Sequence, residues 1–283
     1  MTQRNAEIAQ SYAEKRRLKM TESTPIALTI AGLDPSGGAG VIADVRTFVS
    51  LGCFPTAALT SITFQNTTGV FGAVHQTAAT LRGQLEPIAK DLKVAAVKTG
   101  MLPTAEIVSC VADLLEELNL PAPVVDPVMV STSGHDLIGP EAFQVLTSRL
   151  LPLARLITPN IPEAERLAGF SINNEADMRR AGRVILDQNV SVVLIKGGHL
   201  GSQGGSVVDL MMDQDGEEIE LRSKFVDVGP IHGTGCTLSA AIAANLAQGL
   251  ELSESVRAAK KFVDHRIRAL LTSTRIGHGA LPL

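Results

Sequence analysis

The sequence predicts a doubly wound α/β fold, in which a mostly parallel sheet is covered by helices on both faces. From Pro25 onward, short runs rich in Val, Ile and Leu alternate with segments of helical periodicity. The predicted strands are apolar almost throughout, which is typical of strands that are buried on both faces. The stretch 207–226 breaks the alternation, because its two runs flank Asp215-Gly216. This turn predicts a small antiparallel hairpin at an edge of the sheet.

The individual elements follow from these patterns. The first strand, "IALTIAG" at 26–32, precedes "GVIADVRTFVSLG", in which Val41, Val45 and Phe48 recur at helical spacing and Gly52 marks the end. Further strands are expected at 56–64, 94–100, 123–129, 156–160 and 191–198. Further helices are expected at 78–92, 104–118, 140–154 and 176–188, and two more from about Thr234 and Ser253.

Length and composition favour one globular domain. The chain has 283 residues, 45% of them hydrophobic and 19% charged. We divide it into a mobile N-terminal tail at 1–24 and a single domain at 25–283. The formal net charge of -4 argues against nucleic-acid binding, which needs a basic surface.

The apolar runs and the cysteines indicate in which cellular compartment the protein works. No apolar run reaches the roughly 18 residues needed to cross a membrane. Cys53, Cys110 and Cys236 form no CxxC pair and no metal-ligand spacing with histidine. Sparse, unpaired cysteines suit a reducing compartment, so we expect a cytoplasmic protein with no membrane partner.

Polar residues stand where six of the predicted strands end. In chain order they are "GLDPSGGAG", Gln65-Asn66, Gly100-Met101, Asp126-Pro127, Pro159-Asn160 and Lys196-Gly197-Gly198-His199. Ligands of an open parallel sheet bind at the carboxyl ends of its strands, where these loops converge. The sequence therefore predicts a ligand-binding site at this edge of the sheet.

The first glycine-rich loop raises the question of a dinucleotide cofactor. "GAGVIA" at 38–43 satisfies the GxGxxA pattern of dinucleotide-binding folds. That pattern also needs an acidic residue about 20 positions further on, and no Asp or Glu occurs between Asp44 and Glu86. A nicotinamide cofactor is therefore disfavoured. A P-loop is excluded, because the sequence contains no GxxxxGK[ST].

A second glycine-rich stretch, "HGTGCTLSAA", stands at the start of a predicted apolar helix. Gly233, Thr234, Gly235 and Cys236 offer successive backbone N–H groups there, and the helix dipole adds positive potential. One interpretation is a tight turn before a core helix, with Cys236 as a small buried side chain. The other is an anion-binding site with the thiol aimed at the bound group.

The polar residues at the later strand ends also have two interpretations. Asn160 and Glu163 fit a helix cap, or they arrange magnesium-bound water around a polyphosphate. Asp126 is a turn residue before proline, or it organises magnesium and phosphate. Lys196 is a loop lysine, or it neutralises a nucleotide phosphate.

Seven stretches, in this order, resemble the hydroxymethylpyrimidine/phosphomethylpyrimidine kinases of thiamin biosynthesis. They are "LTIAGLDPSGGAG", "QNTTGV", "VKTGML", "VVDPVM", "LITPNIPEAERL", "IKGGHL" and "HGTGCTLSAA". This family belongs to the ribokinase-like superfamily and is related to the pyridoxal kinases. The resemblance runs from about Ile26 to Gly279 and implies a ribokinase-like fold.

The resemblance implies a role for each candidate residue. Gly32 and Ala39 wall the pyrimidine and Met101 packs against it. Gln65 binds a ring nitrogen and the amino group, and Asp44 lies near the hydroxymethyl group. The preceding Thr63 and Phe64 are bulkier than expected at the ring site. The implied Mg²⁺ and phosphate residues are Asp126, Asn160 and Glu163, with Lys196 and Gly197 on the nucleotide side and Gly233, Thr234, Gly235 and Cys236 as the catalytic anion hole.

The resemblance also implies an activity. We expect ATP- and Mg²⁺-dependent phosphorylation of 4-amino-5-hydroxymethyl-2-methylpyrimidine to its monophosphate and then its diphosphate, by a homodimer. A pyridoxal (vitamin B6) kinase is the alternative enzyme, and a nucleotide- or vitamin-binding protein without turnover is the alternative from another class. The segment 131–136, rich in Ser, Thr and Gly, is the candidate lid.

Cys236 stands where many sugar kinases of the superfamily carry Asp. For an alcohol acceptor, a thiolate whose pKa is lowered at a helix N-terminus could accept the proton. For a phosphate-monoester acceptor, a neutral thiol avoids the repulsion that a carboxylate would exert. We therefore expect Cys236 to suit an enzyme that phosphorylates an alcohol first and a monophosphate second.

Overall fold

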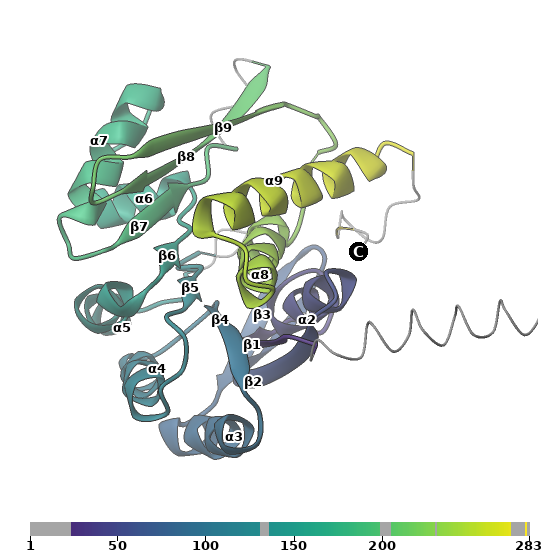
Figure 1. Ribbon diagram of the computed structural model, residues 1–283, viewed down its shortest axis with the longest axis vertical. Coiled ribbons are helices and arrows are strands. Elements are labelled where there is room, and N and C mark those ends of the chain that lie inside the picture. The colour runs from purple at the N-terminus through teal and green to yellow at the C-terminus, as the bar shows by residue number, and fades with distance from the viewer. Residues whose placement is uncertain (1–23, 131–135, 199–204, 230, 273–280, 282–283) are drawn as a thin grey trace, which may run out of the picture.

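A computed structural model describes residues 24–130, 136–198, 205–229, 231–272 and 281. These residues form a nine-stranded sheet with the order β3-β2-β1-β4-β5-β6-β7-β8-β9 (Figure 1). The parallel strands at its centre are β2 (Phe54–Asn66), β1 (Ile26–Leu33), β4 (Val94–Thr99), β5 (Val124–Val125), β6 (Leu156–Ile157) and β7 (Val192–Ile195). The predicted fold class is confirmed. The expected tail at 1–24 and the candidate lid lie almost entirely outside the described residues.

Both edges of the sheet are antiparallel. The expected hairpin is formed by β8 (Ser206–Asp213) and β9 (Glu218–Lys224), with β8 antiparallel to β7. The opposite edge was not expected: β2 extends to Asn66 and turns back into β3 (Gly69–His75). The sequence pattern missed β3 because its side chains are exposed or half-buried, so no apolar run marks it.

Helices cover both faces of the sheet (Figure 1). One face carries α3 (Ala78–Asp91), α4 (Ala105–Glu117), α5 (Pro140–Val145), α6 (Ile161–Ala168) and α7 (Glu175–Leu186). The other face carries α2 (Gly40–Ser50), α8 (Thr234–Ala247) and α9 (Leu252–Ala269). Each set of helices buries its own apolar cluster against the sheet. No described helix combines the length and apolar character needed to span a membrane.

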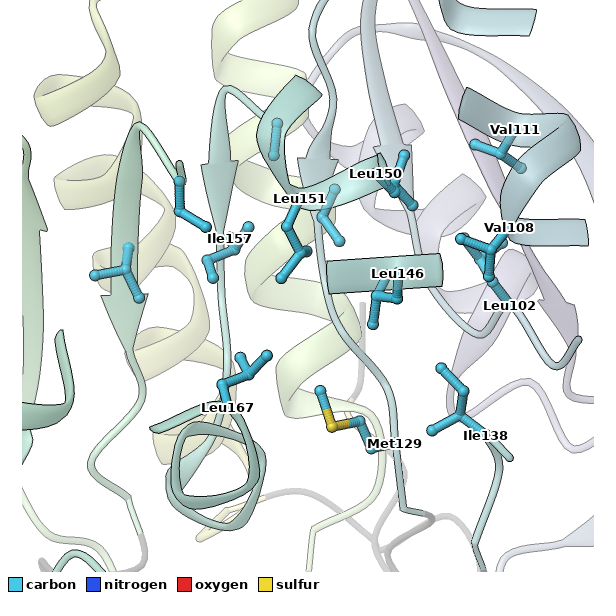
Figure 2. Close-up of a cluster of buried hydrophobic side chains, with 14 of the residues drawn as sticks. Leu102, Val108, Val111, Met129, Ile138, Leu146, Leu150, Leu151, Ile157 and Leu167 are labelled. Atoms are coloured by element: carbon cyan, nitrogen blue, oxygen red, sulfur yellow. The ribbon is translucent and has the colours of Figure 1, made fainter. Parts of the chain in front are cut away.

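The helix expected at 140–154 is divided. After α5 the chain forms a π-helical turn, Leu146–Leu150, and a 3-10 turn, Leu151–Leu153. Pro152 has no backbone N–H to continue a regular helical ladder. Its neighbours Leu150 and Leu151 are nevertheless fully buried in the cluster that Figure 2 shows. Packing against the sheet therefore holds a segment that is not regular helix.

Candidate active site

A cavity of about 160 Å³ lies at the carboxyl edge of the parallel strands. Its walls come from the loop after β1, the β2–β3 ribbon, the ends of β4 to β7 and the start of α8. The structure brings these candidate residues together in its wall: Gly32, Ala39, Gln65, Met101, Asp126, Asn160, Glu163, Lys196, Gly233, Gly235 and Cys236. The convergence expected from the strand-end positions is therefore present.

Two glycine-rich loops meet backbone to backbone at this cavity. Gly233, the N-cap of α8, has a φ of 84°, and a Cβ there would lie 1.7 Å from the carbonyl oxygen of Gly38. Gly40 has a φ of 57°, and a Cβ there would lie 2.3 Å from the carbonyl oxygen of Gly32. Only glycine fits either position, because a side chain would clash and the left-handed conformation disfavours one. The glycines thus allow the two loops to pack closely.

A histidine and a buried aspartate link the same two loops. Asp34 accepts hydrogen bonds from the backbone N–H and hydroxyl of Ser36 and from the backbone N–H of Ala39. The Nε2 of His232 lies 2.9 Å from Oδ2 of this carboxylate, the oxygen that also accepts from Ala39. Burial by itself raises the pKa of Asp34, but the hydrogen bonds from His232, Ser36 and Ala39 outweigh it and leave the pKa lowered. Sequence reasoning did not select Asp34 or His232, although both stand inside the quoted glycine motifs.

The Cys236 thiol lines the cavity and is neutral at physiological pH. Burial raises its pKa to about 11, and the carboxylates of Asp126 and Asp44 raise it further, whereas Lys98 lowers it. The expectation of a lowered pKa at the helix N-terminus is wrong, because desolvation disfavours the thiolate more than the helix and Lys98 favour it. The expectation of a thiol that does not repel an anion agrees with this protonation state.

Asp126 and Lys196 form an ion pair in the cavity wall. The Nζ of Lys196 lies 2.8 Å from Oδ1 of Asp126, and the hydroxyls of Thr158 and Ser239 donate to the same carboxylate. Burial raises the pKa of Asp126, but Lys196 and Lys98 outweigh it and lower the pKa. A Cβ on Gly235 would lie 3.0 Å from the Lys196 ammonium. The ammonium therefore adjoins the backbone at the start of α8.

Asn160 and Glu163 cap α6 and line the cavity as well. The Asn160 side chain accepts from the Glu163 N–H, and the Glu163 carboxylate accepts from the Asn160 N–H. Glu163 is only 4% exposed. Its burial, reinforced by Asp126 and opposed by Lys196, raises its pKa to about 7. The two interpretations of this pair are therefore compatible, since the capping box aims a buried carboxylate at the cavity.

The structure does not bring three candidate residues to this wall. Asp44 is completely buried and bonds to Lys98 and Thr29. The N–H of Gly197 donates to Asp209, and a Cβ there would lie 1.9 Å from the Val208 carbonyl oxygen, so Gly197 allows β7 to approach β8. Thr234 lines a neighbouring cavity instead.

The acceptor side of the cavity is formed by the β2–β3 ribbon and the loop after β4. Gln65 and Met101 both line it, and the Met101 sulfur lies 3.5 Å from where a Cβ on Gly32 would stand. Thr63 lines it too and donates to the Leu33 carbonyl oxygen. Phe64 is 53% exposed, because it alternates to the outer face of the ribbon. Phe64 therefore does not crowd a ring bound in the cavity.

A second cavity of about 370 Å³ adjoins the first. Lys196 borders both, and Thr234 at the start of α8 borders the second. Its remaining wall mixes apolar side chains, among them Val226, Val228, Ile231 and Ile267, with basic and acidic ones. Lys260 in this wall is paired with Asp209 and Asp264. The loop that begins α8 therefore borders both spaces, the larger of which has apolar walls and charged side chains of both signs.

The close approach of the two loops gives a stability prediction. Replacing Gly233 by Ala should lower the free energy of unfolding by clearly more than replacing Gly249 by Ala. Both glycines have positive φ, so both variants incur left-handed strain of about 1–2 kcal/mol. Only Gly233 adds a clash with Gly38, since no described atom outside the immediate chain neighbours lies within 4 Å of a Cβ on Gly249. Equal losses in urea titrations would contradict the close packing of the loops.

The raised pKa of Glu163 gives a pH prediction. The ordinary pKa of 4.5 applies in the unfolded chain and a pKa of about 7 in the folded one, so the folded state binds more protons between these values. Because of Glu163, the free energy of unfolding therefore falls as pH rises from 5 to 7, by up to about 3 kcal/mol. The Glu163→Gln variant should lack this loss in urea titrations at pH 5 and 7.5. Parallel pH profiles for variant and wild type would show that the pKa is not raised.

Comparison with known proteins agrees with this geometry. The family model described as phosphomethylpyrimidine kinase matches residues 34–283. The hydroxymethylpyrimidine/phosphomethylpyrimidine kinase of Haemophilus influenzae is 43% identical over 253 residues, 89% of this chain and 94% of that protein. A crystal structure of phosphomethylpyrimidine kinase from Clostridium difficile is 41% identical, with a TM-score of 0.75, and covers 86% of this chain and 100% of its own.

A more distant likeness links the chain to vitamin B6 kinases. The structure of pyridoxal kinase from Staphylococcus aureus in complex with AMP-PCP and pyridoxal is 32% identical and has a TM-score of 0.82. It covers 93% of each chain. The resemblance stated from the sequence motifs is confirmed, as are the enzyme class and the ribokinase-like fold. The chain belongs to the phosphomethylpyrimidine kinase family and is a phosphotransferase.

Proposed function

We propose that this enzyme transfers the γ-phosphoryl group of ATP to the hydroxymethyl group of 4-amino-5-hydroxymethyl-2-methylpyrimidine, and then to the resulting monophosphate. The observation that carries the proposal is the neutral Cys236 thiol at the start of α8, which lines the smaller cavity, while the neighbouring Thr234 lines the larger one. An uncharged group at this point tolerates an alcohol and a phosphate monoester alike. The activity belongs to thiamin biosynthesis, and the three free cysteines suit the cytoplasm.

The larger cavity is the proposed ATP site. Val226, Val228 and Ile267 offer apolar walls to a base. From there a triphosphate reaches Lys196 and the N-terminus of α8, where unpaired N–H groups and the helix dipole favour an anion. The pyridoxal kinase of S. aureus, which shares this fold, forms a complex with the nucleotide analogue AMP-PCP, and this supports a nucleotide site here.

On the acceptor side, the ring is proposed to lie in the smaller cavity. Gln65 can donate and accept hydrogen bonds at once, which matches a ring nitrogen beside an amino group. Met101 packs against the ring, and Gly32 and Ala39 leave a flat wall for it. This arrangement directs a ring substituent toward Cys236 and the start of α8.

The carboxylates in the smaller cavity, beside Lys196, fit Mg²⁺. Asp126 and Glu163 supply carboxylate oxygens, and Mg²⁺ is commonly held by one or two carboxylates together with waters and substrate phosphates. The described residues contain no cluster of three or more ligating side chains, so phosphates and water must complete the coordination. When bound, the ion neutralises charge on the phosphates. Asn160 holds the Glu163 carboxylate in place through the capping box.

In this mechanism the protein contributes mainly position and charge. Lys196 and the α8 N–H groups stabilise the phosphoryl group while the acceptor oxygen attacks phosphorus and the bond to the β-phosphate breaks. The alcohol's proton can leave late, after the new bond has begun to form, and pass to water or to an oxygen of the transferred phosphoryl group, so a thiolate base is not required. A monophosphate acceptor has no proton to lose in its dianionic form. The same neutral site therefore serves both transfers.

A product assay tests the proposal. Wild type, Cys236→Ser and Cys236→Asp are each given ATP and Mg²⁺ with the pyrimidine alcohol, its monophosphate or pyridoxal, and products are identified by mass spectrometry. Wild type should make the monophosphate and then the diphosphate. Cys236→Asp should lose at least about tenfold more kcat/KM toward the monophosphate than toward the alcohol, because a carboxylate repels the anionic acceptor. Cys236→Ser is the uncharged control and should keep the ratio.

Other outcomes would redirect the proposal. Phosphorylation of pyridoxal alone would make this a vitamin B6 kinase, and no product from any acceptor would leave a binding protein. An unchanged ratio in Cys236→Asp would contradict the requirement for a neutral group at this position.

We also propose that the enzyme is a homodimer joined through the outer face of the β2–β3 ribbon. Ile62, Phe64, Phe71 and Val74 are between 40% and 71% exposed there, and Ile62 pairs with Val74 across the strands. A ribbon that lines the acceptor cavity with one face and exposes aromatic side chains on the other fits a second copy of the chain. Phe71→Asp should yield monomers in sedimentation experiments, whereas Leu271→Asp, also well exposed but beyond α9, should not. A monomeric wild type at micromolar concentration would contradict the dimer.

A further inference from the structure

A buried lysine that the mechanism does not use lies beneath the acceptor cavity. Lys98 is fully buried in β4, a central strand, between Thr29 of β1 and Val124 of β5. An ionised lysine in a sheet core is costly unless it is paired. Its Nζ lies 2.8 Å from Oδ2 of Asp44, which also accepts from Thr29. The lysine is therefore held as an ammonium in the core.

The ion pair of Lys98 and Asp44 is oriented, with the lysine nearer the cavity than the aspartate. Lys98 forms part of the cavity wall, whereas Asp44 does not. A Cβ on Gly100 would lie 2.8 Å from the ammonium, so the missing side chain of Gly100 leaves room for the charge at the wall. The Oδ1 of Asp44 has no hydrogen-bond partner among the described residues. The pair is thus a fixed dipole with its positive end toward the cavity.

The other charged groups at the cavity wall show why the positive end of the Lys98–Asp44 dipole matters for an anionic acceptor. Asp126 and Glu163 bring negative charge to the cavity, and Lys196 is bonded to Asp126. Burial by itself lowers the pKa of Lys98, but Asp44, Cys236 and Asp126 raise it, so the ammonium lies within electrostatic reach of all three. A neutral alcohol gains little from a positive end at the wall. A phosphate monoester carries up to two negative charges, which must approach the carboxylates of Asp126 and Glu163. It therefore gains much more binding energy than the alcohol from a positive end at the wall.

We propose that Lys98, oriented by Asp44, determines specificity by making the cavity accept a phosphate monoester as well as an alcohol. This inference rests on the proposed two-step function. Lys98 acts as a positioning residue through its electrostatic field, and no contact with the reacting atoms is required of it. The function of Asp44 is to fix the ammonium rather than to bind the hydroxymethyl group.

The test compares kcat and KM for the alcohol and for the monophosphate, at saturating ATP and Mg²⁺. The main variant is Lys98→Met with Asp44→Asn, because replacing both partners leaves no unpaired buried charge. It should lose at least about tenfold in kcat/KM toward the monophosphate, mainly through KM, and much less toward the alcohol. Asp44→Asn alone removes the carboxylate that fixes the ammonium, so it should also show a selective loss toward the monophosphate. Lys90→Met, on the exposed side of α3, should change neither acceptor.

A purely structural pair would give a different result. Equal losses toward both acceptors, or an unchanged preference between them in the double variant, would overturn the inference while leaving the proposed function intact. A wild type that phosphorylates neither acceptor would overturn both. Calorimetric titration with the monophosphate in the absence of ATP gives a second readout if turnover is lost: the double variant should bind it at least about tenfold more weakly than wild type. Unchanged binding would also overturn the inference.

Discussion

The active site depends on a backbone contact between two loops that are almost 200 positions apart in the chain. Gly233 touches the Gly38 carbonyl, and the Asp34 carboxylate joins His232 to the N–H of Ala39. The first loop closes the acceptor side of the cavity, and the second begins α8 and presents its N–H groups. Their contact fixes the distance between acceptor and anion site. A shift of one loop would misplace the attacking oxygen. Catalysis that depends on positioning is slowed even by a small displacement of the reacting atoms.

The charges around this contact are arranged so that each ionised group named here has a counter-charge. Asp126 pairs with Lys196 and Asp44 with Lys98, while Cys236 remains a thiol. Glu163, with a pKa of about 7, is the group most ready to change its protonation state. A site that must hold a triphosphate and then two acceptors of different charge gains from this balance, because the carboxylate of Asp126 is paired and the added negative charge meets two ammonium groups.

Parallel topology explains why reasoning from strand ends succeeded. In a parallel sheet every carboxyl end points to the same edge, so residues that follow β1, β4, β5, β6 and β7 must converge there. Gln65, Met101, Asp126, Asn160 and Lys196 were located by this rule alone. The rule predicts at which edge of the sheet a residue lies, but not in which direction its side chain points. Gly197 and Asp44 lie close to that edge, yet Gly197 serves a strand contact and Asp44 points into the core.

The sequence by itself determined the fold class, the β8–β9 hairpin, the helix N-terminus at Gly233 and the set of polar strand ends. Apolar periodicity and glycine positions are local properties, and they specify these features directly. Only the tertiary structure decided the raised pKa of Cys236, the orientation of Lys98 and the link between Asp34 and His232. It also revealed β3, which has no buried run to mark it. Each of these depends on which distant segment packs against a residue, because that neighbour sets its solvation and its charge partners.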